Sequence, residues 1–231
     1  MHDYQKNGIT GDETGTTLTV TNNDVVGQGA TTGAAENGIQ IGFGAAGTVT
    51  GNLVIDDVWA PDTISDPGDA AAGILIFDSV AFQAAVKTNT VGNTQFGIAL
   101  VGDSPGQGDG VTVASNKVFG TRIFDGIDVC TNGNTIQSNT VVNSAESAIH
   151  LDATCGSTGN NNLVTGNTLI DACTGVLEDS GTSGNSISSN SAAALGTTSD
   201  SSCTSTPANA GGKMKTRRGA SNHGNFRPAR P

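Results

Sequence analysis

The residues best suited to chemistry form one group of three aspartates and a histidine in the middle of the chain. They lie in or directly after three similar segments, DGIDV (125–129), SAIHL (147–151) and TGVLE (174–178), and are Asp128, His150, Asp152 and Asp179. A histidine between carboxylates can act as an acid or a base, and paired carboxylates can share a proton or bind Ca²⁺. Carboxyl groups about 5 Å apart also occur in retaining glycosidases. All four are therefore candidate catalytic residues, and Asp152 and Asp179 are candidate metal ligands.

The elements that would bring these residues together are short parallel strands. In each segment apolar residues alternate with others, which is typical of a β-strand. If the apolar residues point inward, Asp128 and His150 lie on adjacent strands about 5 Å apart, and Asp152 and Asp179 are also neighbours. The group then lies on the outward face of its strands. Solvated polar residues without a function are the alternative interpretation of that face.

Two patterns repeat in phase along the chain before residue 195. The pattern apolar-x-x-Asn-x-apolar occurs seven times, around Asn23, Asn52, Asn89, Asn116, Asn139, Asn167 and Asn190. A second pattern, small-apolar-x-apolar, alternates with it at NGIQI (37–41), AGILI (72–76), FGIAL (96–100) and the three segments above. Seven phased copies predict one repeating structural unit.

Each unit contains short strands separated by Gly, Asn, Ser and Thr, with no room for a helix. Such short strands must pair with those of the next unit, which predicts an all-β, right-handed parallel β-helix of about seven coils over residues 1–205. We expect the recurring Asn to occupy the left-handed backbone region at a bend and to stack as an internal asparagine ladder. We also expect the β-helix to be truncated at its N-terminal end.

The VTGN, TNTV and NGI repeats resemble those of right-handed parallel β-helix proteins, the superfamily that includes pectate-lyase-like and NosD-like chains. The resemblance spans about residues 4–195. It implies a fold but no single reaction, because the superfamily includes polysaccharide lyases, glycoside hydrolases, epimerases, phage tailspikes and members without an established activity. The chain lacks an NTD motif followed by a DD pair and HG, as in the pectin-hydrolysing group, and lacks the DPHE of alginate epimerases.

The composition and charge of the chain limit the classes of partner that it could bind. The chain has 33 Gly residues and only 4% aromatic residues, which excludes an ordinary helical bundle, and no apolar stretch is long enough to span a membrane. All 21 acidic residues lie at or before Asp200, where only four Lys and Arg residues stand against them, so this body has a formal charge of −17. Such a body repels nucleic acid and offers little to hold a polyanion, so a neutral polysaccharide is the better candidate partner. Residues 206–231 carry the other six cations and are predicted to be a disordered basic tail.

An apolar patch precedes the acidic group on the same outward face. It consists of Leu75, Phe77, Ala99 and Val101. We expect the insertion 56–71 to cover it through Trp59 and Ile64, with an oligomer contact as the alternative. The five aspartates of this insertion could bind Ca²⁺, but their spacing is not that of an EF-hand, and a solvated acidic loop is the alternative. The oligomeric state stays open.

The four cysteines all lie in the second half of the chain. Cys130 and Cys155 follow equivalent strands of adjacent coils and are predicted to form a disulfide, while Cys173 and Cys203 could link the last coil to the segment after it. Such disulfides suit an extracellular or cell-surface protein. Reduced, buried thiols are the alternative.

These observations leave two functions open. The first is a non-catalytic β-helix module of a secreted or cell-surface protein that presents a glycan- or partner-binding face. The second is a carbohydrate-active enzyme, a polysaccharide lyase or glycoside hydrolase, that uses the Asp/His group. The missing family motifs and scarce aromatics favour the first, and the group of four residues favours the second. No cofactor is required by either, although Ca²⁺ could be bound.

Overall fold

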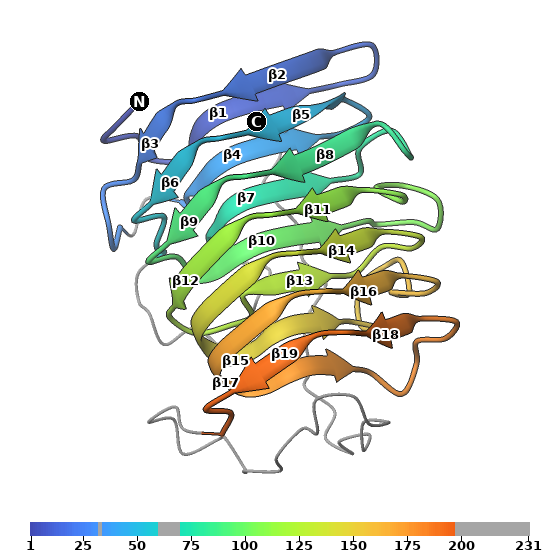
Figure 1. Ribbon diagram of the computed structural model, residues 1–231. Helices are drawn as coiled ribbons and strands as arrows, with labels where there is room; N and C mark the ends of the chain where they lie inside the picture. Colours follow the sequence, from blue (N-terminus) through green and yellow to red (C-terminus); the bar gives the residue numbers. More distant parts are fainter. Residues whose placement is uncertain (32–33, 60–69, 197–231) are drawn as a thin grey trace.

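The chain folds into a parallel β-helix, seen in the computed structural model of Figure 1. The structure describes residues 1–31, 34–59 and 70–196. All strand pairs in this part are parallel, and each strand pairs with its equivalent in the coils before and after it. The all-β fold predicted from the repeats is therefore confirmed, while the number of complete coils stays a prediction. No helix long and apolar enough to cross a membrane occurs in the described residues.

Three series of strands form the walls. The first carries the small-apolar-x-apolar segments and comprises β1 (Asn7–Asp12), β4 (Asn37–Gly42), β7 (Ala72–Phe77), β10 (Phe96–Val101) and β13 (Ile127–Val129). The second is a separate seven-stranded sheet of β2 (Thr17–Thr21), β5 (Ala46–Thr50), β8 (Ala84–Lys87), β11 (Thr112–Ala114), β14 (Thr135–Gln137), β16 (Leu163–Thr165) and β18 (Ser186–Ser188). The third follows each ladder asparagine and comprises β3 (Asp24–Val26), β6 (Leu53–Ile55), β9 (Thr90–Gly92), β12 (Lys117–Thr121) and β19 (Ser191–Ala193).

Two long strands join the third wall to the first near the C-terminal end. They are β15 (Thr140–Leu151) and β17 (Thr168–Glu178), which merge both walls into one twelve-stranded sheet. Their pairing register shifts between Ser144 and Ser147, where the chain turns from one wall to the other. The second halves of these strands continue the first wall after β13.

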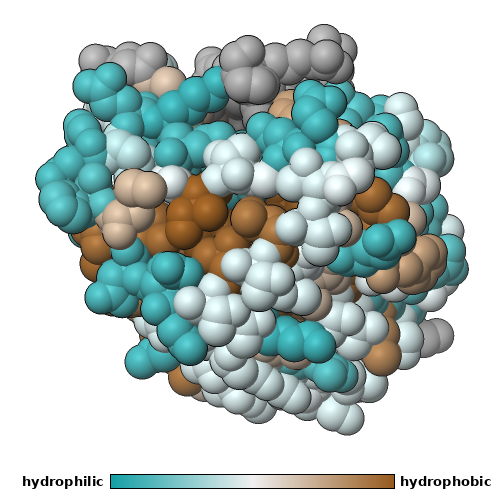
Figure 2. Space-filling view, turned by 90° about the horizontal axis from the view of Figure 1, so that it is seen from above, coloured by the Kyte–Doolittle hydropathy of each residue, from teal (hydrophilic) through white to brown (hydrophobic). Residues whose placement is uncertain are grey.

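The core is a stack of β-branched and leucine side chains inside the coils. Ile74, Ile98, Ile127 and Ile149 follow one another in register and are fully buried. Each belongs to an alternating segment, so period two places the apolar residues inside, as predicted. At the N-terminal end this interior is only partly covered: Ile9 and Leu18 are partly buried, and Figure 2 shows apolar residues gathered in the middle of that end.

The predicted asparagine ladder is present inside the bend before the third wall. Asn52 N–H donates to Oδ1 of Asn89 at 2.9 Å, and the same bond repeats from Asn116 to Asn139 and from Asn139 to Asn167 at 2.9 Å. The predicted backbone conformation was wrong by one residue. The residue before each ladder Asn has the positive φ, for example Ser115 at 57° and Ser138 at 56°. The Asn itself is thereby free to point inward and pair along the stack.

A second, shorter amide ladder lies at the entry to the second wall. Asn134 N–H donates to Asn162 Oδ1 at 2.8 Å, and Asn162 N–H donates to Asn185 Oδ1 at 2.7 Å. The sequence carries its signal, since each of these residues precedes a ladder Asn by five positions. Two ladders tie the last coils together where the site lies.

Candidate functional site

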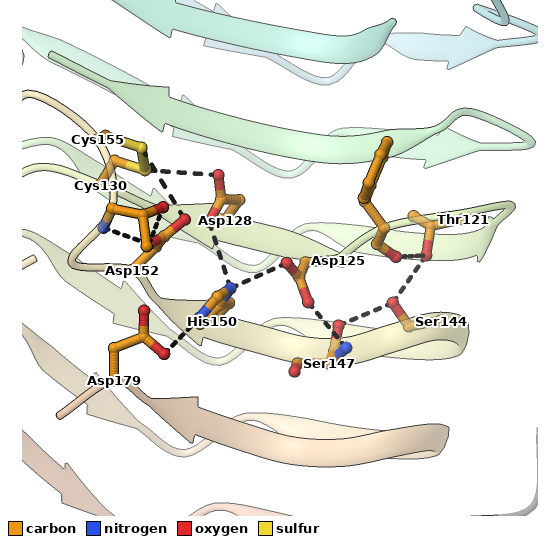
Figure 3. A network of polar contacts seen from close by, with 12 residues as sticks. Thr121, Asp125, Asp128, Cys130, Ser144, Ser147, His150, Asp152, Cys155 and Asp179 are labelled. Carbon is orange, nitrogen blue, oxygen red and sulfur yellow. Dashed lines mark hydrogen bonds and ion pairs between the residues drawn. A yellow bond between two sulfur atoms is a disulfide. The ribbon is translucent and has the colours of Figure 1, made fainter. Parts of the chain in front are cut away.

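The predicted outward row is correct in register. Ala99 pairs with Asp128, Asp128 with His150, and His150 with Leu177 on successive strands β10, β13, β15 and β17. Asp152 and Asp179 lie just beyond the ends of β15 and β17, and each offers a ligand atom within 4.8 Å of the other and of His150. The structure therefore brings together all four residues that the spacing predicts (Figure 3).

The alternative interpretation, that this row is solvated, was wrong. Asp128, His150 and Asp152 are 5%, 2% and 4% exposed, and only the side chain of Asp179, at 25%, is partly open to solvent. The outward-facing side chains are therefore buried here, in a polar layer outside the apolar core of the coils. Polar residues that are removed from water in this way need partners, which alternation in the sequence does not reveal.

A fifth residue, Asp125, belongs to the group and was not predicted. It is 1% exposed and precedes β13. Its Oδ1 accepts the backbone N–H of Ser147 at 2.8 Å, and its Oδ2 lies 3.1 Å from Nδ1 of His150. Asn37, at the equivalent position of an earlier coil, accepts the backbone N–H of Ala72 in the same way. A polar residue at the first position of the small-apolar-x-apolar segment was therefore the sequence signal that could have predicted Asp125.

His150 lies at the centre of the cluster, between carboxylates on both sides. Nδ1 lies 3.1 Å from Asp125 and 3.9 Å from Oδ1 of Asp128, while Nε2 lies 3.3 Å from Oδ1 of Asp179. We call Asp125, Asp128, His150, Asp152 and Asp179 the buried acidic cluster. Its four carboxyl groups outnumber the single imidazole, so the group favours an additional positive charge.

Burial and charge shift the pKa values of three members in a coherent way. Burial lowers the pKa of His150, but the charge of Asp125 and the carboxylates of Asp125 and Asp179, which accept from the imidazole, outweigh burial and raise that pKa well above its usual value. Burial, reinforced by Asp152, raises the pKa of Asp128 well above its usual range. Burial also acts to raise the pKa of Asp179, but the hydrogen bond and charge of His150 reverse this and lower it. The cluster thus favours protons on His150 and Asp128 and a charge on Asp179.

The predicted disulfide adjoins the cluster. Cys130 follows β13, Cys155 follows β15, and the two form a disulfide with a Cα–Cα distance of 5.7 Å. The sulfurs lie 3.7 Å from Asp128 and 4.0 Å from Asp152 respectively. The suggested link between Cys173 and Cys203 involves a residue outside the described part of the chain.

The apolar patch is buried, and within the described residues Ala70 of the insertion 56–71 belongs to its cluster, while Trp59 is not one of the residues packed against it. Leu75, Phe77, Ala99 and Val101 belong to one cluster with Phe96 and Phe124, and Phe43 and Ile123 pack against it. Trp59 instead uses its backbone N–H and carbonyl to pair with the Gln95 amide at 2.9 and 3.0 Å. The other predicted contact, Ile64, lies outside the described residues. Within the described residues, the patch is therefore contacted by aromatic residues, by Ile123 and by Ala70 at the end of the insertion.

The acidic insertion is only partly described. Asp62, Asp66 and Asp69 lie outside the described residues. Asp57 is fully buried and accepts a hydrogen bond from the phenol of Tyr4, so the alternative interpretation, a solvated acidic loop, does not hold for this residue. Burial raises the pKa of Asp57 well above its usual range.

Comparison with known proteins identifies the family. The family model described as periplasmic copper-binding protein (NosD) matches residues 4–202. The chain belongs to the NosD family. No curated protein and no solved structure matches it. The expected resemblance to NosD-like β-helix proteins is thereby confirmed, and the periplasmic description of the family agrees with the expected location outside the cytoplasm.

The donor set of the buried acidic cluster suits one kind of copper ion. Imidazole nitrogen and carboxylate oxygen are ligands for Cu(II), whereas Cu(I) prefers thiolate and thioether sulfur. In the described residues the sulfur near the cluster belongs to the disulfide. Asp125, Asp128 and His150 each offer a ligand atom within 4.8 Å of the others, as do His150, Asp152 and Asp179. With bonds of about 2 Å, ligand atoms around one ion lie about 3 Å apart, and His150 lies 3.1 Å from Asp125, 3.3 Å from Asp179 and 3.9 Å from Asp128. The residues fit Cu(II).

Proposed function

We propose that this chain is a non-catalytic β-helix module that binds a divalent metal ion, in first place Cu(II), in the buried acidic cluster. The observation that carries the proposal is a set of three buried donors, Asp125, Asp128 and His150, within 4.8 Å of one another. Asp128 Oδ1 is buried and makes no hydrogen bond, so a ligand atom is available. The family description supports copper as the ion.

The remaining residues have defined roles in this proposal. In the metal-free protein Asp125 Oδ2 holds Nδ1 of His150 in place, because its other oxygen is fixed by Ser147, and a bound ion would take the place of the proton between these two atoms. Asp179 is the partly exposed member, so an ion would enter past it. A bound Cu(II) ion would supply the positive charge that the four carboxylates favour, and the rigid stack of coils would keep its ligands in place.

Burial supports an ion as the ligand of this cluster rather than a polysaccharide. A glycosidase or lyase needs its carboxyl groups to reach a sugar, whereas Asp125, Asp128 and His150 are at most 5% exposed. The carbohydrate-active alternative and the glycan-binding face stay predictions. Ca²⁺ prefers six to eight oxygen ligands, so the central imidazole makes Cu(II) the better candidate.

The decisive experiment uses a protein in which His150 is the last histidine. We expect the variant His2→Gln with His223→Gln to bind one Cu(II) per chain, with nitrogen coupling in its electron paramagnetic resonance spectrum. Adding His150→Gln should remove that coupling and weaken binding at least about tenfold. Asp24→Asn, an exposed and distant change, is the matched control and should leave affinity unchanged. Equal Cu(II) affinity with and without His150 would refute the proposal.

A further inference from the structure

The disulfide beside the cluster covers a second group of metal-ligand atoms. Cys130, Cys155 and Asp152 each offer one ligand atom, all within 4.8 Å of one another. Asp152 also belongs to the donor group with His150 and Asp179. We propose that reduction of Cys130–Cys155 creates a thiolate site for a thiophilic divalent cation such as Zn²⁺ or Cd²⁺, contiguous with the buried acidic cluster. This proposal does not require the oxidised cluster to bind Cu(II).

The donors are held in place without help from the disulfide. On one side, Cys130 N–H donates to the Leu100 carbonyl at 2.8 Å, and Asp152 N–H donates to the Val129 carbonyl at 3.0 Å. On the other side, Ser157 N–H donates to the Gly102 carbonyl at 2.9 Å. The segment that carries Cys155 is therefore pinned at both ends. Breaking the bond between the sulfurs leaves the two thiols facing each other across adjacent coils.

Asp152 has one oxygen for the fold and one for a ligand. Oδ1 accepts the N–H and the hydroxyl of Thr154 at 2.6 and 2.7 Å, which fixes the turn after β15. Oδ2 faces the sulfurs and lies 4.0 Å from Sγ of Cys155. A disulfide sulfur carries no proton, so in the oxidised protein this is a contact and not a hydrogen bond. Two thiolates and one carboxylate form a donor set that zinc commonly takes.

The two sulfurs differ in access to a reductant. Cys130 is fully buried, whereas Cys155 is partly exposed. A dithiol can therefore attack Sγ of Cys155, and the electron pair of the S–S bond leaves with Cys130. The dithiol closes to its own disulfide, and two protein thiols result. Binding of a divalent cation then displaces the two thiol protons.

The Asp152 carboxylate makes the cation important for the reduced state. It lies 4.0 Å from Sγ of Cys155 and would repel free thiolates. A divalent cation placed between sulfur and carboxylate removes this repulsion. The reduced site is therefore expected to bind its ion tightly and to remain as neutral thiols without one.

The test uses Cd²⁺ and a protein with only two cysteines. In the background Cys173→Ser with Cys203→Ser, the reduced protein should bind one Cd²⁺ per chain and show ultraviolet thiolate-to-cadmium absorption, which the oxidised protein lacks. Asp152→Asn keeps the acceptor for Thr154 and should weaken Cd²⁺ at least about tenfold. Asp24→Asn is the exposed control and should change nothing.

Three outcomes would overturn the proposal. They are a reduced protein that binds Cd²⁺ no better than the variant Cys130→Ser with Cys155→Ser, identical spectra before and after reduction, and loss of the β circular dichroism signal on reduction. The variant His150→Gln separates the two proposals. In the background His2→Gln with His223→Gln, it should weaken Cu(II) binding by the oxidised protein at least about tenfold and leave the thiolate-to-cadmium signal intact.

Discussion

Asp125 holds His150 from the neighbouring coil with one carboxylate that serves two purposes. Oδ1 caps the backbone N–H of Ser147 at 2.8 Å, and Oδ2 lies 3.1 Å from the imidazole Nδ1. The orientation of the histidine is thus tied to the pairing of β13 with β15. The same carboxylate favours a charged imidazole, which gives the stability of the protein a dependence on pH.

The contribution of His150 to stability should decrease as the pH rises. Its pKa is raised in the folded protein, so the stabilisation is complete below the unfolded pKa of about 6.5 and is lost as the pH rises through the folded value. Each unit of difference is worth about 1.4 kcal/mol. Denaturant unfolding at several pH values should show wild type losing its advantage over His150→Gln. The exposed His2→Gln serves as control, and a difference independent of pH would contradict the prediction.

Replacing Asp128 by Asn should stabilise the metal-free protein at neutral and basic pH. Burial and Asp152 raise the pKa of Asp128, so the wild-type carboxyl either keeps a proton or carries a costly buried charge. The expected gain in unfolding free energy is on the order of 1 kcal/mol at pH values above the pKa of Asp128 in the folded protein. It should shrink below about pH 4, where Asp128 is protonated in both the folded and the unfolded protein. Thermal unfolding measures this directly. A loss of stability at every pH would show that the Asp128 charge supports the fold.

How far the sequence anticipates the site depends on what each residue contacts. Pairing of Asp128 with His150 follows from period-two alternation, because register in a parallel stack is set by buried Ile127 and Ile149. Their burial could not be predicted, because alternation shows which face a side chain lies on but not whether that face is exposed to solvent. Asp125 could not be predicted from the alternation, because it precedes β13 and binds the backbone of the next coil at Ser147.

Replacing Asn139 by Leu should destabilise the protein by about 1–3 kcal/mol. The Asn139 side chain donates to the Val113 carbonyl and to Asn167 Oδ1, both at 3.0 Å, and accepts from Asn116 N–H at 2.9 Å. All these groups are buried, so leucine leaves them without partners. Gln137→Leu, two residues earlier and outside the core, is the amide control. Equal melting temperatures for the two variants would show that the ladder bonds of Asn139 do not stabilise the protein.

The disulfide should appear in unreduced protein as one peptide pair joining Cys130 to Cys155. The bond closes a loop with a sequence separation of 25 residues, so its removal in Cys130→Ser with Cys155→Ser should cost about 3 kcal/mol. Mass spectrometry checks the link, and denaturant unfolding checks the cost. Free thiols at both positions in protein made under oxidising conditions would contradict the link.

The asparagine ladder also shows that the distance between coils does not depend on the number of residues between successive ladder asparagines. Asn52 and Asn89 are 37 residues apart, and Asn116 and Asn139 are 23 apart, yet both pairs make the same N–H to Oδ1 bond of 2.9 Å. The rise from coil to coil is therefore insensitive to how much polypeptide leaves and re-enters between asparagines. Evolution can lengthen or exchange these excursions without disturbing neighbouring coils, and a protein engineer can graft foreign loops at the same points.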